Sequence, residues 1–437
     1  MTDYDRIRIL WPDHLGIPRG KYLPVHLAER GTGHCVTTFG LGYDRSMIPA
    51  PGSYLLEGLK DVWATYDPAE LHPGWEDDGT GVAVAHLDFE GAPYTFAARH
   101  ALQQAVAGWE ELGYRPQVGI ELEAYVLQDD GEGGFERWKT PRSFVYGTGR
   151  SADPTGLIDD ILRTAWRCGF PLESVNAEFD EAQFELTLEH RPALRAADDA
   201  FLFRVLAREV ALEHGLDLTF LGKPFPGVSG SGVHVNFSML DADGRNVFDD
   251  PEAEHGLADL ARQCIAGLVA HHRGLTALCA PTVNAYRRLQ PAELSGYWAN
   301  WGYEHRCVGN RVPDNRGSAT RIESRLADGA VNIHLGVAAV LQAARLGVVG
   351  ELDCPDPETG DGFEDVNTDV CSAPSLSAAL DDLEADGALV DAVGRDVCEN
   401  FVANKRAEWD RYIAAVGEDT PGGDVTSWEI AEYLMYH

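Results

Sequence analysis

Six side chains with metal-binding chemistry lie in four short segments of this sequence. They are Glu121, Glu123, Glu178, Glu185, His234 and Glu323. Five carboxylates and one imidazole can share a buried site only if cations neutralise them, because an unpaired carboxylate is costly to remove from water. Hard divalent ions such as Mg²⁺ or Mn²⁺ suit mainly oxygen ligands with one imidazole. The residue types therefore predict a site for such ions.

Arginines accompany these carboxylates along the chain. The stretch from NAYRRL to GNRVP contributes four of them and RIESR two more: Arg287, Arg288, Arg306, Arg311, Arg321 and Arg325. Arginine binds phosphate and carboxylate groups in bidentate fashion, so metals beside arginines favour phosphoryl transfer to a carboxylate substrate. For any single arginine, pairing with the acidic exterior is the alternative. The segment GVSGSG precedes an expected strand and not a helix, so it does not predict a dinucleotide site.

Four strands are expected to position these groups. In VGIELEAYVL, AQFELTL, VHVNFSML and RIESRL, apolar residues alternate with polar ones, so that each strand has one apolar and one polar face. Glu178 is seven residues from Glu185, an odd offset, and must reach the site from a bend or from the end of the preceding strand. A solvated face is the alternative for any one strand. Four polar faces holding Glu, His, Asn, Gln and Arg favour a shared site.

Two domains are expected, residues 1–97 and residues 98–437. The first reads as short strands broken by glycine and proline: RIRIL, KYLPV, HCVTTF and GVAVAHLDF. From about residue 97 helices alternate with strands, and helices are predicted over 97–113, 155–170, 198–215 and 256–279. The acidic stretch 351–369 is expected to be a solvated loop.

Charge and cysteine content limit the partners and the compartment. The chain of 437 residues has 70 acids, 35 bases and a formal net charge of −35, with lysine at only five positions. A lysine-poor acidic surface suggests adaptation to high salt, and a merely acidic cytosolic enzyme is the alternative. Nucleic acid and anionic membranes require a basic face, so neither is an expected partner. Eight cysteines without a CxxC spacing, no apolar signal core and no run of about 18 apolar residues predict a cytoplasmic protein.

The segments that carry these residues resemble the glutamine synthetase family in order and spacing. They are GIELEAYVL, AEFDEAQFEL, GKPFPGVSGSGVHVNFS, NAYRRL through GNRVP, and RIESRLADGAVNIHLGVAAVLQAARLG, with weaker similarity in ILWPDHLGIPRGKYLP. The resemblance implies an α+β fold: an N-terminal β-grasp domain and a catalytic domain with a curved antiparallel sheet flanked by helices. It also implies a homo-oligomer of stacked rings, usually a dodecamer, with active sites shared between neighbouring subunits.

The resemblance also implies a role for each site residue. Two or more Mg²⁺ or Mn²⁺ ions are expected, the first bound by Glu123, Glu178 and Glu185, and the second by Glu121, His234 and Glu323. The amino-acid substrate is expected at Arg288, Arg325 and Gly230. The transferred phosphate is expected at Arg306, Arg311 and Arg321. The ATP co-substrate is expected at Ser238 and at Asn236, which replaces a common histidine.

The implied reaction is phosphorylation of the γ-carboxylate of glutamate by ATP, followed by attack of an amine. This chain departs from the family where ammonium is bound. The flap glutamate is replaced by Leu294, with Glu293 one place away, and only Asp44 lies near the segment that would supply an aspartate. Ser229 replaces a usual asparagine. We therefore expect an organic amine as the nucleophile. Glutamine synthetase proper, a non-catalytic ring-forming scaffold or regulator, and a metal-dependent hydrolase are the alternatives.

Overall fold

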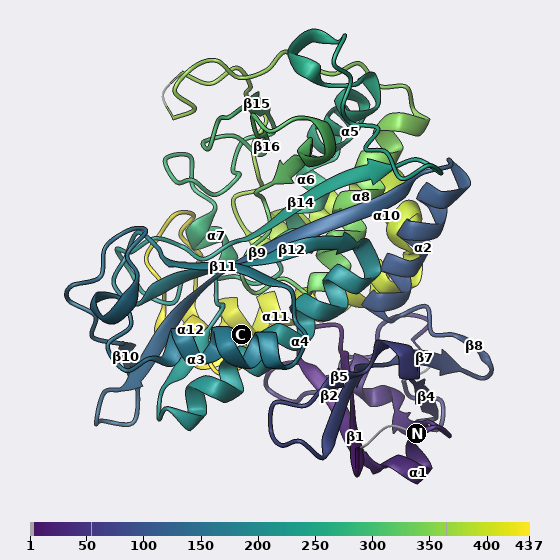
Figure 1. Ribbon diagram of the computed structural model, residues 1–437, viewed down its shortest axis with the longest axis vertical. Coiled ribbons are helices and arrows are strands. Elements are labelled where there is room, and N and C mark those ends of the chain that lie inside the picture. Colours follow the sequence, from purple (N-terminus) through teal and green to yellow (C-terminus); the bar gives the residue numbers. More distant parts are fainter. Residues whose placement is uncertain (1–3, 54, 364) are drawn as a thin grey trace.

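A computed structural model describes residues 4–53, 55–363 and 365–437. In it the chain forms three β-sheets and a set of helices (Figure 1). Helices and strands are mixed, as an α+β fold requires. The two smaller sheets are formed by the N-terminal residues and lie together at one end of the molecule, and the large sheet crosses the rest (Figure 1).

The N-terminal residues form two four-stranded sheets. The first has the order β2 (Pro18–Pro24), β1 (Arg6–Pro12), β6 (Thr80–Val84) and β5 (His72–Pro73), and the second β3 (Thr32–Cys35), β4 (Asp61–Thr65), β7 (His86–Phe89) and β8 (Ala92–Pro93). A four-residue helix, α1 (Val25–Ala28), follows β2. Strands β1 and β6 are parallel, so this sheet is mixed.

Two strand predictions in this region needed correction. The segment HCVTTF is a strand only to Cys35 and continues as a 3₁₀ helix over Val36–Phe39. The run GVAVAHLDF is two strands, β6 and β7, in different sheets. Ile7 and Ile9 of β1 and Val62 of β4 are fully buried in a hydrophobic cluster separate from the main one. The division into domains at residue 97 stays a prediction.

The large sheet carries the candidate site. Its order is β11 (Leu172–Ala177), β12 (Gln183–Pro192), β9 (Arg115–Asp129), β14 (Val233–Leu240), β17 (Ile322–Ser324), β16 (Asn310–Val312) and β15 (Trp301–Tyr303), and β10 (Phe135–Arg137) and β13 (Asp217–Thr219) also pair with β9. Strands β15 and β16 are parallel and the other pairs are antiparallel. The sheet is therefore mixed, whereas an antiparallel sheet was expected.

The register of this sheet sets the candidate ligands side by side. Glu185 of β12 pairs with Glu123 of β9, and His234 of β14 pairs with Glu121 of β9. Glu323 of β17 stands opposite Asn236 of β14. The alternating apolar residues, including Leu122, Phe184 and Val235 among others, are buried on the other face, as predicted. Because directly opposed residues point to the same face of a sheet, one face collects the carboxylates.

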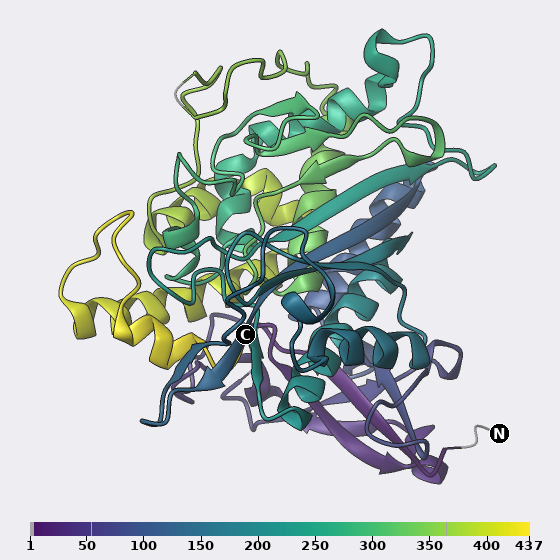
Figure 2. The ribbon, with the colours of Figure 1, turned by 60° about the vertical axis from the view of Figure 1, so that its left-hand side comes forward.

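Helices pack against the sheet and against one another (Figure 2). They are α2 (Ala98–Glu111), α3 (Leu157–Arg167), α4 (Ala193–Glu213), α5 (Asp259–Ala270), α6 (His272–Cys279), α7 (Ala285–Arg288), α8 (Ile333–Val349), α9 (Leu376–Ala385), α10 (Gly387–Val393), α11 (Arg395–Val416) and α12 (Ser427–Tyr433). The single helix expected over 256–279 is two, α5 and α6, with His271 between them. Helices α5 and α8 approach closely where Gly267 meets Gly347. A Cβ on Gly267 would lie 2.2 Å from the carbonyl oxygen of Ala343, so this approach requires glycine.

The structure also describes the acidic stretch 351–369, the cysteines and the length of the helices. Residues 351–369 contain no described helix or strand, but Glu358 is buried and accepts hydrogen bonds from the backbone N–H groups of Gly360 and Asn367, so the stretch is not simply solvated. All eight cysteines, which lie among the described residues, are free thiols. No helix in the described part of the chain has both the length and the apolar character to span a membrane.

Candidate active site

His234 is the centre of two groups of potential metal ligands. Its Nδ1 lies 3.0 Å from Oε2 of Glu121 and 3.5 Å from Oε1 of Glu323, and its Nε2 lies 3.8 Å from Oε1 of Glu123. One ligand atom each of Glu121, His234 and Glu323 falls within 4.8 Å of the others, as does one each of Glu123, Glu185 and His234. The first group is the set that the resemblance implied for a second metal ion.

Glu178 lies outside both groups. It follows the last residue of β11, as its odd offset from Glu185 required, and its Oε2 accepts the N–H of Phe179 at 3.0 Å. Burial and the charge of Glu123 raise the pKa of Glu178. The Glu178 carboxylate is therefore in the electrostatic range of Glu123, but it is not among the ligand atoms that lie within 4.8 Å of one another.

The electrostatics of the cluster differ between its two sides. Burial raises the pKa of Glu185 to about 7, and the neighbouring charges of Glu121, Glu178 and Glu123 act in the same direction. Burial acts on Glu323 too, but Arg325, His234 and Arg311 outweigh it and hold its pKa below the usual range. The side at Glu185 thus has an excess of negative potential that a divalent cation would relieve, and the oxygen-rich donor set with one imidazole fits Mg²⁺ or Mn²⁺.

Two of the predicted arginines hold Glu323 between them. Nη1 of Arg311 donates to Oε2 of Glu323 at 2.8 Å, and Arg325 pairs with Oε1 of the same carboxylate. Arg311 also pairs with Glu304, whose other oxygen accepts the N–H of Asp314 at 2.7 Å. Glu304 was not predicted from the sequence, since it comes from a loop with no periodic pattern that would aim its side chain at Arg311.

Arg288 and Gly230, both expected at the amino-acid site, lie against each other. Arg288 is buried and donates to the carbonyl oxygens of Leu326 and Arg325 at 3.3 and 3.2 Å. A Cβ on Gly230 would lie 2.6 Å from Cγ of Arg288, so only glycine allows this approach. The neighbouring Arg287 points elsewhere and pairs with Glu429 and Asp419, which makes it a structural residue of the C-terminal helices.

Arg306 and Arg321 occupy different surroundings. Arg306 is exposed in the loop between β15 and β16 and makes no hydrogen bond or ion pair with any other residue that the structure describes. Nε of Arg321 donates to Oδ1 of Asn236 at 3.1 Å, and Nδ2 of Asn236 donates to Oε1 of Glu121 at 2.9 Å. A chain of hydrogen bonds therefore connects Arg321 to the ligand group around His234.

A cavity of about 510 Å³ opens beside this chain. Asn236 and Ser238, expected at the ATP site, and Arg321, expected at the transferred phosphate, line it together with Glu121. Glu173 and His190 also line it and were not predicted. Both fall where the strand register shifts, between Leu172 and Ser174 and between Leu188 and Arg191. Such bulges redirect side chains and leave no clear sequence signal.

Comparisons with known proteins identify the family. The family model described as glutamine synthetase, catalytic domain, matches residues 95–430. The chain belongs to the glutamine synthetase family. Glutamine synthetase of Halobacterium salinarum is 31% identical over 445 residues, covering 98% of this chain and 93% of the relative. Glutamine synthetase of Methanocaldococcus jannaschii is 32% identical over 446 residues, covering 98% and 95%. Family membership makes the protein an ATP-dependent ligase of the glutamate–ammonia ligase type.

Solved structures of the glutamine synthetase family share the whole fold. A structure titled "Apo GmaS without ligand" has a TM-score of 0.83 and 29% identity, and covers 98% of this chain and 96% of its own. A structure titled "Crystal structure of novel glutamine synthase homolog" has a TM-score of 0.81 and 25% identity, covering 97% of each chain. The similarity therefore extends over the N-terminal sheets as well as the catalytic sheet.

Leu294, which the resemblance places at the position of the family's flap acid, is apolar. The Leu294 side chain is half exposed, and its carbonyl oxygen accepts from Nη2 of Arg325 at 3.5 Å. The adjacent Glu293 lies 3.7 Å from Nζ of the buried Lys223. Asp44 pairs with Arg411 and Ser46 within its own chain. The one acid next to the flap position therefore already has a cationic partner.

Proposed function

We propose that this member of the glutamine synthetase family joins the γ-carboxylate of glutamate to an organic amine, with ATP as co-substrate. The proposal is carried by the segment expected to form the flap: Leu294 is apolar and half exposed, and Glu293 already lies 3.7 Å from Nζ of Lys223. An ammonium ion needs anionic partners to replace its hydration, whereas an alkyl group favours an apolar contact. The fold of GmaS, a γ-glutamylmethylamide synthetase, supports the same substrate class.

In the proposed reaction an oxygen of the γ-carboxylate attacks the γ-phosphorus of ATP, ADP leaves, and γ-glutamyl phosphate forms. The amine nitrogen then attacks the acyl carbon, phosphate leaves, and the nitrogen loses one proton. Arg288 and Arg325 would orient glutamate, with Gly230 giving the close approach. Arg306, Arg311 and Arg321 would offset the charge of the transferring phosphoryl group. Buried surroundings would keep water from the acyl phosphate.

Two or more Mg²⁺ or Mn²⁺ ions would be held by Glu121, Glu123, Glu178, Glu185, His234 and Glu323. These ions supply charge neutralisation and Lewis-acid polarisation of phosphoryl oxygens. The adenine nucleotide would occupy the cavity that Asn236 and Ser238 line. We also propose a ring-forming homo-oligomer in the cytoplasm, usually twelve subunits in the family. Mass photometry of the purified protein measures the subunit number directly.

Glutamine synthesis from ammonia is the second candidate, since the similar proteins of Halobacterium salinarum and Methanocaldococcus jannaschii carry that name. The test is ATP-dependent phosphate release with glutamate and Mg²⁺ against ammonium, simple alkylamines, ethanolamine and putrescine. We expect kcat/KM for one organic amine to exceed that for ammonium. A kcat/KM for ammonium equal to or above every organic amine would reject the organic-amine proposal and leave glutamine synthesis.

Leu294→Glu restores a carboxylate at the flap, and Leu294→Gln is its uncharged control. We expect Leu294→Glu alone to lower KM for ammonium, by about tenfold, because a charge-assisted hydrogen bond contributes about 1.5 kcal/mol or more. Equal effects of the two variants would mean that the charge at this position does not select the amine.

A further inference from the structure

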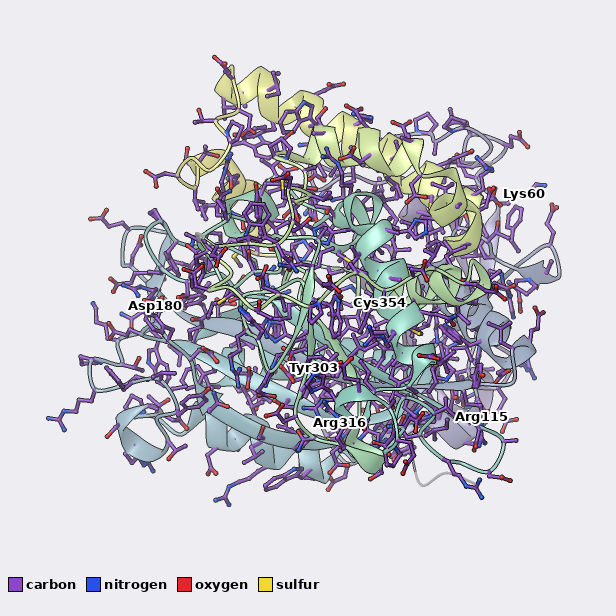
Figure 3. The ribbon with its side chains drawn as sticks, turned by 90° about the horizontal axis from the view of Figure 1, so that it is seen from above. Lys60, Arg115, Asp180, Tyr303, Arg316 and Cys354 are labelled. Carbon is purple, nitrogen blue, oxygen red and sulfur yellow. The ribbon has the colours of Figure 1, made fainter. Side chains whose placement is uncertain are left out.

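Asp180 lies in the turn between β11 and β12, two residues after Glu178 and five before Glu185. In the view from above it lies at the opposite side of the molecule from Arg115, the first residue of β9 (Figure 3). The turn that contains Asp180 is fixed on both flanks. Ala182 has a left-handed backbone (φ +66°) and its N–H donates to Oγ1 of Thr140 at 3.0 Å. Such a conformation in a residue other than glycine persists only where the surroundings hold it.

One oxygen of Asp180 holds the glycine turn of the candidate substrate site. The N–H of Ser229 donates to Oδ2 of Asp180 at 2.6 Å, and the hydroxyl of Tyr125 donates to the carbonyl oxygen of Ser229 at 2.9 Å. The next residue, Gly230, has its carbonyl oxygen bound by Nε2 of Gln183 at 2.9 Å and lies against Arg288. Asp180 is therefore in direct contact with the turn that carries Gly230.

The other oxygen of Asp180 keeps its capacity to accept a hydrogen bond. Among the described residues the one cation within 4.0 Å is Arg137, whose Nη1 is 4.0 Å from Oδ1, too far for a hydrogen bond. The side chain is 23% exposed. An aspartate that is mostly covered and only half satisfied, at the edge of a substrate turn, offers a negative charge to a cationic ligand.

We propose that Asp180 binds a protonated amino group of a substrate at this site. The inference rests on the proposed function, whose substrates present two such groups: the α-ammonium of glutamate and the protonated form of the amine. The other acids nearby have different partners. Glu293 pairs with Lys223, and Glu123 and Glu185 belong to the ligand group around His234. Asp180 is the carboxylate of this turn that bonds to the residue next to Gly230 and still has an oxygen left for an ammonium group.

The turn offers a matched pair of variants. Asp180→Asn keeps an oxygen that can accept from the N–H of Ser229 but removes the charge. Glu181→Gln removes a charge from the next residue, whose Oε1 accepts the N–H of Thr140 at 2.6 Å on the other flank of the turn. Both variants keep their backbone contacts, so a purely structural role predicts the same behaviour for both.

The experiment measures binding by calorimetry, for glutamate and separately for methylammonium, with Mg²⁺ and a non-hydrolysable ATP analogue, and then KM where turnover is found. We expect Asp180→Asn to weaken one of the two ligands by about tenfold or more, and Glu181→Gln to weaken neither. Weaker glutamate binding would identify the α-ammonium as the group bound, and weaker methylammonium binding the amine substrate.

Unchanged affinities for both ligands in Asp180→Asn would overturn the proposal and leave Asp180 as an acceptor for Ser229 alone. Equal losses in Asp180→Asn and Glu181→Gln would also overturn it, since they would report the shape of the turn. Because binding is measured without turnover, a wild-type protein that binds glutamate but releases no phosphate would reject the proposed function and still decide the role of Asp180.

Discussion

Glu185→Gln should stabilise the metal-free protein while abolishing its activity. Glu185 is largely buried among three other carboxylates, and its pKa is raised from 4.5 to about 7. Between pH 4.5 and about pH 7 the folded state binds more protons than the unfolded state, so the stability of the wild type falls as pH rises through this range. The stability that the wild type loses through this pKa shift amounts to about 3 kcal/mol at pH 8 and to about 1.5 kcal/mol at pH 5.5. Glutamine carries no charge and escapes this penalty.

The assay is thermal unfolding in the presence of a chelator at both pH values. For a chain of 437 residues, about 3 kcal/mol corresponds to a rise in Tm of roughly 3 °C. We expect Glu185→Gln to melt higher than the wild type at pH 8, with a smaller advantage at pH 5.5. Saturating Mn²⁺ should reverse the order, because the wild type gains the binding free energy of the ion.

Two results would refute this reasoning. If Glu185→Gln melts at or below the wild-type temperature at pH 8 without metal, ionisation of the Glu185 carboxylate does not destabilise the folded protein. If the advantage of Glu185→Gln is the same at both pH values, the cause is packing and not ionisation. Glu181→Gln, outside the ligand groups, is the control for a general effect of removing one negative charge.

Three further predictions address the substrate sites and the surface. Gly230→Ala should raise KM for glutamate by about tenfold or more with little change in KM for ATP, because the new Cβ would lie 2.6 Å from Cγ of Arg288; an unchanged KM for glutamate would remove Gly230 from the site. Arg321→Gln should raise KM for ATP by about tenfold and leave Mn²⁺ affinity unchanged, because its guanidinium lines the cavity and is bonded to Asn236; a loss of Mn²⁺ affinity alone would contradict this. The net charge of −35 predicts that Tm rises between about 0.15 M and 1 M KCl, where the Debye length falls from about 8 to about 3 Å, and a flat or falling Tm would contradict high-salt adaptation.

Strand alternation was enough to predict which face of each strand would carry the polar side chains. A period of two places Glu121 and Glu123 on one face of β9, and the same rule applied to β12 and β14 brings Glu185 and His234 to that face. Short-range patterns such as these survive folding because each strand buries its apolar side. Strand β17 has only three residues, so Arg321 and Arg325 lie just outside it, yet Arg325 pairs with Glu323 and Arg321 bonds to Asn236, the residue opposite Glu323.

Features that depend on irregular backbone could not be predicted. The bulges that bring Glu173 and His190 to the cavity, and the loop that brings Glu304 to Arg311, have no periodic signal. The pairing of Lys223 with Glu293 joins residues 70 positions apart and depends on tertiary packing. Arg287 and Arg288 are adjacent in sequence, yet α7 directs Arg287 to the C-terminal helices and Arg288 to the site.

The most direct test of the central claim is a competition measured by mass spectrometry of the products. Wild-type protein, ATP, Mg²⁺ and glutamate are supplied with isotopically labelled ammonium and a simple alkylamine at equal concentration. The apolar flap at Leu294 and the Lys223–Glu293 pair predict that the γ-glutamyl alkylamide exceeds glutamine by about tenfold or more. Glutamine as the main product would contradict the claim that this flap selects an organic amine.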